Sequence, residues 1–267
     1  SWGEELSISS TNVKTNDFSW QTSLIYSHNR TEITNLYNQG RVIDLVQGNG
    51  FAKQGYPARA LFSIPFVGIN EKGNPVCINE KGQATVGDLN FQERNNTDYL
   101  IYEGSTDPIY NGSLGNTFNY KGFHLNLFLT YAFGNVVRLD PVFKAKYNDL
   151  TSMNHDFKNR WMQPGDENVT NVPGVVSRYE YEQNRTLLST AYNAYNYTSV
   201  RTAKGDFIRL KEISLAYDFP HRWLENSPVN NISLKLQATN LMLLYADKKL
   251  NGQDPEFMNA GGVASPM

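Results

Sequence analysis

The strongest constraint on the fold is a strict alternation of apolar and mostly polar residues between positions 123 and 133. Because successive side chains of a β-strand point to opposite faces, a period of two predicts a strand with one apolar and one polar face. Its length matches the ~9–11 residues that a tilted strand needs to cross a bilayer. The odd positions, all apolar, are Phe123, Leu125, Leu127, Leu129, Tyr131 and Phe133.

The same alternation recurs along the chain. Lys121-Gly122 is predicted to form a two-residue turn, because Gly readily takes the positive φ that such turns require. The apolar residues change parity between Leu210 and Ile213, so we expect a β-bulge near Lys211 and Glu212. The sequence predicts six long strands, at about 5–14, 17–31, 109–121, 122–137, 206–219 and 231–245.

The connections between these strands alternate between short and very long. Residues 32–108, 138–205 and 246–267 are expected to form long loops, whereas the remaining links are tight turns or short. Short turns on one side and long loops on the other are typical of outer-membrane barrels. Within the first loop, Asn70-Glu71-Lys72-Gly73 recurs as Asn79-Glu80-Lys81-Gly82, which predicts two turns flanking a small hairpin.

Composition and motifs exclude several classes of function. The net charge of -2 offers no broad basic surface, so we expect no nucleic-acid partner. A single cysteine, Cys77, excludes a disulfide scaffold. The sequence contains no H-E-x-x-H, G-x-S-x-G or P-loop motif. We therefore expect no enzyme activity, no metal site and no cofactor.

Several segments resemble the SusC/RagA family of TonB-dependent outer-membrane transporters. The segment 205–217, Gly-Asp-Phe-Ile-Arg-Leu-Lys-Glu-Ile-Ser-Leu-Ala-Tyr, resembles the family's penultimate downward strand. Each motif alone is weak evidence for the family, but five of them occur along the chain in the family's order. The other four resemble the family's next strand, the loop before its last strand, a hairpin and a loop motif, at 231–245, 252–256, 105–123 and 159–166.

The resemblance implies an all-β fold that is part of a transmembrane antiparallel β-barrel. Residues 1–267 would be a C-terminal segment, with about six of the 22 strands of such a transporter. The final strand, the earlier strands and the N-terminal plug would then lie outside this chain. Counting back from a last strand that ends in the periplasm places every short turn in the periplasm and every long loop outside the cell.

The resemblance also implies a function and partners. It implies import of a nutrient, an oligosaccharide or a peptide, powered by TonB acting through the missing N-terminal part. A SusD-like surface lipoprotein would cover the extracellular mouth, and the location would be the outer membrane of a Gram-negative bacterium of the Bacteroidota. The pattern of residues alone leaves open a soluble carbohydrate-binding β-sandwich, with the same apolar residues as its core.

Two sets of residues are candidates for function under this resemblance. The first would face the lipid bilayer, because its members share the apolar parity of the strands: Phe18, Trp20, Leu24, Phe123, Leu125, Leu127, Leu129, Ile232, Leu234 and Leu236. The second set consists of aromatic residues in the second long loop, whose rings could stack on sugars or line peptide pockets. These candidate ligand-binding residues are Tyr147, Trp161, Tyr192, Tyr195 and Tyr197.

Overall fold

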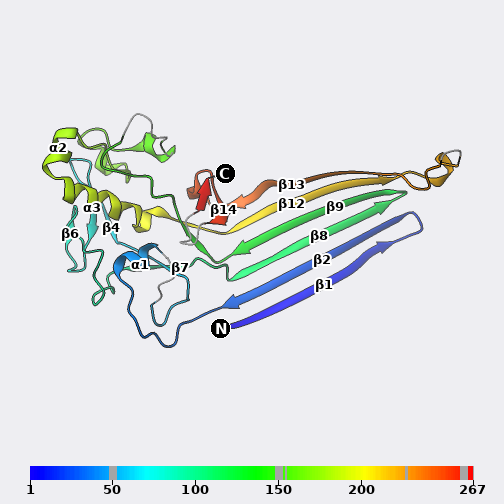
Figure 1. The fold of residues 1–267 in the computed structure, drawn as a ribbon, viewed down its shortest axis with the longest axis horizontal. Coiled ribbons are helices and arrows are strands. Elements are labelled where there is room, and N and C mark those ends of the chain that lie inside the picture. The colour runs from blue at the N-terminus through cyan, green and yellow to red at the C-terminus, as the bar shows by residue number, and fades with distance from the viewer. Residues whose placement is uncertain (48–52, 148–152, 154, 226–227, 259–263, 267) are drawn as a thin grey trace. The chain divides into compact units, whose positions relative to one another are not determined.

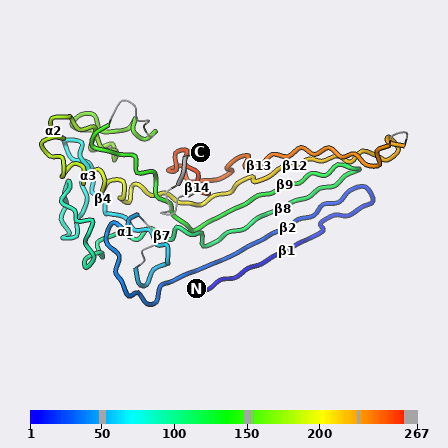
Figure 2. The backbone as a smooth tube through the Cα atoms, in the orientation of Figure 1, coloured from blue at the N-terminus to red at the C-terminus, as the bar shows by residue number. Residues whose placement is uncertain are grey.

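The computed structural model describes residues 1–47, 53–147, 153, 155–225, 228–258 and 264–266. The chain divides into two compact units (Figures 1 and 2). The first unit comprises residues 1–30, 108–134 and 206–246, and the second comprises 31–107, 135–205 and 247–267. No helix among the described residues is long and apolar enough to cross a membrane.

The first unit is a six-stranded sheet in the order β1-β2-β8-β9-β12-β13, with every neighbouring pair antiparallel (Figure 1). The predicted strands match these strands to within three residues at every end but one. The observed strands are β1 (Trp2–Lys14), β2 (Phe18–Arg30), β8 (Tyr110–Tyr120), β9 (Phe123–Phe133), β12 (Phe207–Asp218) and β13 (Ser233–Ala246).

The exception is the end of β9, which was expected at residue 137 and lies at Phe133. Gly134 takes a positive φ of 82°, which ends the extended conformation. The next residues form β10 (Val136–Arg138), which pairs with β11 (Thr202–Lys204) inside the second unit. The sequence pattern missed this change because Val136 and Val137 continue the apolar character of the strand.

Local backbone features of the sheet agree with the sequence predictions. Lys121 and Gly122 both have positive φ, 45° and 86°, as a two-residue type I′ turn between β8 and β9 requires. A bulge at Lys211 is confirmed, because the pairing of β12 with β9 shifts between Leu210 and Glu212. The bulge keeps the apolar residues on both sides of it on the same face of the sheet.

The second unit contains short helices and strands. Its core clusters around residues such as Val42, Leu45, Phe62 and Ile64. Its small sheets are β3-β7, β4-β5-β6, β10-β11 and β14-β15. Besides β10 and β11, its main elements are α1 (Val42–Gln47), β3 (Ala60–Ser63), β4 (Phe66–Ile69), β5 (Pro75–Ile78), β6 (Ala84–Thr85), β7 (Ile101–Ser105), α2 (Arg178–Gln183), α3 (Arg185–Asn196), β14 (Gln253–Met258) and β15 (Ala264–Pro266).

The repeated Asn-Glu-Lys-Gly sequence forms two turns of the same geometry, one on each side of β5. The side-chain carbonyl of Asn70 accepts hydrogen bonds from the backbone N–H groups two and four residues later, at 3.0 and 2.9 Å. That of Asn79 does the same, at 3.0 and 3.0 Å. The two predicted turns are confirmed, and each is closed by an Asn side chain, but they flank the single strand β5 of a three-stranded sheet and not a hairpin.

A buried arginine ties the core of the second unit together. The guanidinium of Arg138 donates hydrogen bonds to the carbonyl oxygens of Phe62 (2.6 Å), Thr198 (2.9 Å) and Val46 (3.2 Å) and to the hydroxyl of Ser63 (3.2 Å). Burial lowers the pKa of Arg138 to about 10, so the side chain stays charged at neutral pH. One side chain thereby connects segments up to 92 residues apart in the sequence.

Candidate functional site

One face of the six-stranded sheet is mostly apolar, except for a hydrogen-bonded polar patch of Ser10, Thr22 and Asn116 on β1, β2 and β8. The strand register places Ile8, Leu24, Leu114, Leu129, Leu210 and Met242 in one row across it. A parallel row contains Val13, Trp20, Phe118, Leu125, Leu215 and Leu236. The nine predicted lipid-facing residues that lie within these strands all fall on this face. The tenth, Ile232, directly precedes β13 and has the same parity.

Aromatic rows border this apolar face at both ends. At the hairpin end the register aligns Phe18, Tyr120, Phe123 and Tyr217, and the rings of Phe123 and Tyr217 lie 4.4 Å apart. At the other end it aligns His28, Tyr110 and Phe133. On β9 the two rows are separated by about 33 Å along the strand. With a tilt of about 40° this becomes about 25 Å across a bilayer, the height of the apolar band of a membrane barrel.

The opposite face of the sheet is polar and hydrogen-bonded. Asn119 Nδ2 donates to Ser19 Oγ at 3.0 Å, and Thr117 Oγ1 donates to Asn126 Oδ1 at 3.2 Å. Phe128 is an apolar exception on this face, where it pairs with Gly115. The face therefore combines small hydroxyl and amide side chains, as in a water-filled lumen.

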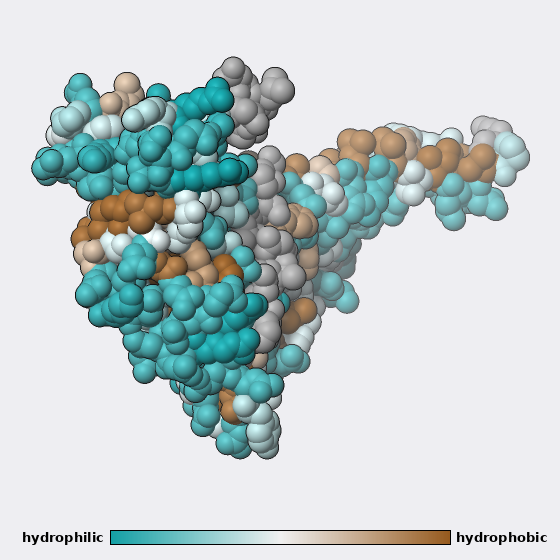
Figure 3. All heavy atoms as spheres, turned by 60° about the vertical axis from the view of Figure 1, so that its left-hand side comes forward, coloured by the Kyte–Doolittle hydropathy of each residue, from teal (hydrophilic) through white to brown (hydrophobic). Residues whose placement is uncertain are grey.

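The apolar face is not covered by the rest of the chain. None of the described residues in the two apolar rows is buried, and Leu234 and Leu236 are 57% and 65% exposed. In contrast, Ser27, Ser113 and Ser214 on the polar face are buried. Figure 3 shows apolar atoms gathered along the strands that extend to the right of the view. A large apolar surface left exposed marks a site of contact with a lipid or a partner.

The aromatic residues predicted to bind a ligand lie mostly in the interior of the second unit. Tyr195 is 2% exposed and packs edge-on against Phe143 at 5.2 Å between ring centroids. The Tyr197 hydroxyl accepts a hydrogen bond from Gln47 Nε2 at 3.0 Å. The faces of these two rings are occupied by the protein, so the structure gives them a role in the core in place of the expected ligand contact.

Trp161 and Tyr147 likewise make local contacts. The Trp161 ring lies directly against Gly73 and Gly174, where a Cβ atom would collide with it. Its Nε1 donates to Glu167 Oε2 at 3.0 Å. The Tyr147 hydroxyl accepts a hydrogen bond from the backbone N–H of Lys144 at 2.8 Å. Trp161 therefore holds two glycine-containing loops together.

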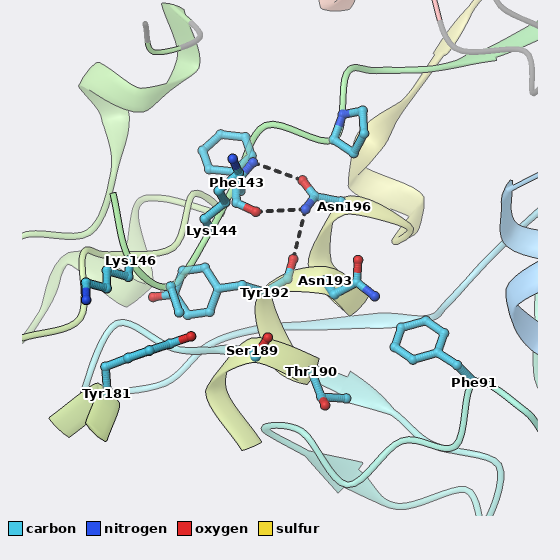
Figure 4. A pocket seen from close by; sticks show the side chains of 12 residues that line it. Phe91, Phe143, Lys144, Lys146, Tyr181, Ser189, Thr190, Tyr192, Asn193 and Asn196 are labelled. Atoms are coloured by element: carbon cyan, nitrogen blue, oxygen red, sulfur yellow. Dashed lines mark hydrogen bonds between the residues drawn. The ribbon is translucent and has the colours of Figure 1, made fainter. Parts of the chain in front are cut away.

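Of the five candidate residues, Tyr192 borders an open pocket, which has a volume of about 420 Å³ (Figure 4). The phenol donates to the carbonyl oxygen of Gly174 at 2.5 Å. Burial raises the pKa of Tyr192, so the phenol remains protonated at neutral pH. The pocket is lined by Phe91, Pro141, Phe143, Lys144, Ala145, Lys146, Tyr181, Ser189, Thr190, Tyr192, Asn193 and Asn196.

Helix α3 and a backbone segment hydrogen-bonded to it build this pocket. The Asn196 side chain accepts from the Phe143 N–H at 3.1 Å and donates to the carbonyl oxygens of Phe143 (2.8 Å) and Tyr192 (3.0 Å). These bonds fix residues 141–146 against the helix. In Figure 4, Ser189, Thr190 and Asn193 of α3 lie between Tyr181 at one end and Phe91 at the other.

Sequence reasoning missed this pocket because it expected an irregular loop over 138–205. A helical signal was nevertheless present. Leu188, Ala191, Tyr192 and Tyr195 recur at intervals of three and four residues, which is the spacing of a buried helix face. On the opposite side of such a helix, Ser189, Thr190 and Asn193 fall together.

The described residues offer neither a cluster of metal ligands nor a reactive thiol. Across the described residues, no three His, Cys, Asp or Glu side chains are grouped so that they could hold a metal ion. Cys77 is buried, and burial raises the pKa of its thiol to about 12. A thiol with such a pKa is almost entirely protonated and unreactive at neutral pH.

Comparison with known proteins gives several relatives, although no family model matches the chain. TonB-dependent receptor P39 of Formosa agariphila is 23% identical, over 99% of this chain and 28% of the relative. TonB-dependent receptor P26 of the same organism is 27% identical, over 97% of this chain and 26% of the relative. The chain thus spans about a quarter of the length of the curated relatives it matches.

Solved structures show the same fold. The RagAB peptide transporter matches with a TM-score of 0.66 and 20% identity, over 97% of this chain and 27% of that chain. The RagAB peptide importer in the 'closed-closed' state matches with a TM-score of 0.67 and 21% identity, over 99% of this chain and 28% of that chain. The resemblance to SusC/RagA-type TonB-dependent transporters is confirmed, and the fold is that of part of such a barrel.

Proposed function

We propose that this chain forms part of an outer-membrane importer, which takes up a nutrient through a plugged β-barrel powered by TonB. The observation that carries the proposal is the exposed apolar face of the sheet, bordered by aromatic rows about 25 Å apart across a tilted barrel. Under this proposal the apolar face contacts lipid and the polar face lines the lumen. The three connections that form the second unit lie outside the cell.

The energetics of the apolar face favour a membrane over a soluble sandwich. In a sandwich, the inward face of each sheet is covered by a second sheet about 10 Å away. Here Leu215, Leu234 and Leu236 remain between 43% and 65% exposed. Exposure of many such side chains to water is costly, at about 25 cal/mol per Å² of apolar surface. A bilayer removes this cost without any second sheet.

The named relatives support the transport role and suggest the partners. The curated relatives are TonB-dependent receptors, and the structural neighbours are RagAB, a peptide transporter. We extend to this chain the import of an oligosaccharide or a peptide, the use of TonB, and a SusD-like surface lipoprotein as partner. A Gram-negative bacterium of the Bacteroidota would be the source, and no catalytic step is part of the proposal.

Extraction of the native protein tests the proposal directly. The outer membrane of the source would be solubilised in detergent, and the protein purified with whatever accompanies it. We expect a mass roughly four times 30.3 kDa, since the chain spans about a quarter of its relatives, together with a co-purifying lipoprotein. Deletion of the gene should abolish uptake of one labelled oligosaccharide or peptide, and a protonophore should do the same in the wild type.

Two other outcomes would contradict the proposal. A protein of 30.3 kDa that stays in the aqueous phase without detergent would exclude the importer. That result would favour the alternative, a soluble carbohydrate-binding β-sandwich, in which the apolar residues of β9 and β12 form the core. A membrane protein whose deletion changes no uptake would support the barrel and contradict the transport role.

A further inference from the structure

The pocket along α3 has an uneven distribution of charge. Two of its lining residues, Lys144 and Lys146, are cations, and no Asp or Glu belongs to the lining. Within the described part of the chain, Lys144 makes no ion pair. Lys146 lies 4.0 Å from Glu182, and both side chains are about half exposed. The pair is therefore weak, and Lys146 can exchange it for another anion.

The same pocket presents polar groups that the protein itself does not use. The side chains of Ser189, Thr190 and Asn193 make no hydrogen bond to another described residue. By contrast, Tyr192 and Asn196 in the wall are fully engaged with backbone groups. The wall is thus fixed, while two hydroxyls and an amide on α3 are available to donate hydrogen bonds to a ligand.

We propose that this pocket binds a carboxylate group of the imported nutrient. A volume of about 420 Å³ lies within the range of small-molecule sites and holds a short segment of a ligand. The carboxylate would be recognised by the ammonium groups of Lys144 and Lys146 and by hydrogen bonds from Ser189, Thr190 and Asn193. Phe91 and Tyr181, at the two ends, would contact apolar parts of the same ligand (Figure 4).

This inference rests on the proposed function only for its ligand, since the pocket itself follows from the described residues. A carboxylate could be carried by a peptide or by an acidic sugar. Both sources present the same group to the lysines. The probes are therefore matched pairs that differ only in charge: tetra-alanine as free acid and as C-terminal amide, and tetragalacturonate with and without methyl esters.

Calorimetry on the full-length protein in detergent would measure the dissociation constant for each probe. We expect at least one acid to bind about five- to tenfold more tightly than its neutral partner at low salt, with the difference reduced at high salt. Preference for the free peptide acid would identify a peptide source, and preference for the galacturonate would identify a glycan source. Equal affinity within both pairs would overturn the inference.

Variants localise the effect to the pocket. The double variant Lys144→Met, Lys146→Met should bind acid and neutral probes alike, and Asn193→Ala should weaken the acid alone. The matched control is Lys72→Met, because Lys72 is an exposed lysine in the 70–74 turn, away from the lining. If the control lost the preference to the same extent as the double variant, the pocket would not be the site.

The two proposals fail in different ways. A protein that imports its nutrient but never prefers the acid would contradict the pocket inference and leave the transport proposal intact. A protein that prefers the acid through Lys144 and Lys146 but imports nothing would contradict the transport proposal. The amount of each variant in the outer membrane serves as the folding check, and it should equal that of the wild type because both lysines are exposed.

Discussion

The assignment of the two sheet faces leads to a depth-dependent prediction on β2. The apolar face of this strand runs from Phe18, in the aromatic row at the hairpin end, to His28, in the row at the other end. The midpoint is Ser23, so Leu24 lies about 3.4 Å from it along the strand. Leu24→Arg would place a charge near the middle of the bilayer, whereas Phe18→Arg would place one at the interface.

The expected costs differ strongly between these positions. An arginine on the lipid face costs about 2–4 kcal/mol at the bilayer midplane and about 0–1 kcal/mol near an interface. A loss of 2–4 kcal/mol lowers the folding equilibrium constant by about 30- to 700-fold. Ser23→Arg is the matched control, because Ser23 is the sequence neighbour of Leu24 and lies at the same depth on the polar face beside Gly115. Its cost should be under about 1 kcal/mol.

The assay is the free energy of folding of the full-length protein into lipid vesicles. Denaturant titrations would be followed by the shift in gel mobility between folded and heated barrels. Leu24→Arg is expected to destabilise the protein most, and Phe18→Arg and Ser23→Arg should each cost no more than about 1 kcal/mol. If Leu24→Arg and Ser23→Arg cost the same, the apolar face does not contact lipid and the reasoning from the strand register is refuted.

Three further predictions concern the second unit. Arg138→Ala should destabilise the second unit by about 3–5 kcal/mol, because the buried carbonyl groups of Val46, Phe62 and Thr198 lose their hydrogen-bond donor. Limited proteolysis of the full-length variant should then detect early cleavage within 31–205. Gly73→Ala should lower the thermal stability of the second unit more than Gly82→Ala does. Both glycines have a positive φ (78° and 74°), but of the two only Gly73 lies where a Cβ atom would collide with Trp161. Cys77 should resist maleimide at pH 7, because burial disfavours the thiolate and raises the pKa of the thiol to about 12. The labelling rate should rise about tenfold per pH unit toward that pKa. Rapid labelling of the folded protein at pH 7 would contradict this prediction.

The sheet could be predicted from the sequence because its signal is local and repeated. Each long strand carries its own alternation, and a slip by one residue would move every apolar side chain to the other face. Even the bulge at Lys211 is visible as a change of parity between Leu210 and Ile213. The ends of the strands are harder to predict from the sequence. On β9, the positive φ of Gly134 ends the strand although the residues that follow are still apolar.

The second unit could not be predicted in the same way, because its order depends on contacts between distant residues. No local pattern indicates that Arg138 will donate to Val46, Phe62 and Thr198. The aromatic residues of 192–197 were interpreted as exposed faces for a ligand. The spacing of Tyr192 and Tyr195 instead places them on the inner side of α3, with Tyr197 at its C-cap. Ser189, Thr190 and Asn193 are left on the side of the pocket.

The way the second unit is assembled has a consequence for how such proteins diverge. It is made from three segments separated in sequence, and hydrogen bonds such as those of Arg138 with Val46 and of Asp140 with Gln253 connect them. A substitution in one segment therefore alters the constraints on the others. We infer that the three segments change together over evolution, as one heritable module. Exchanging all three with those of a relative should preserve folding better than exchanging any one.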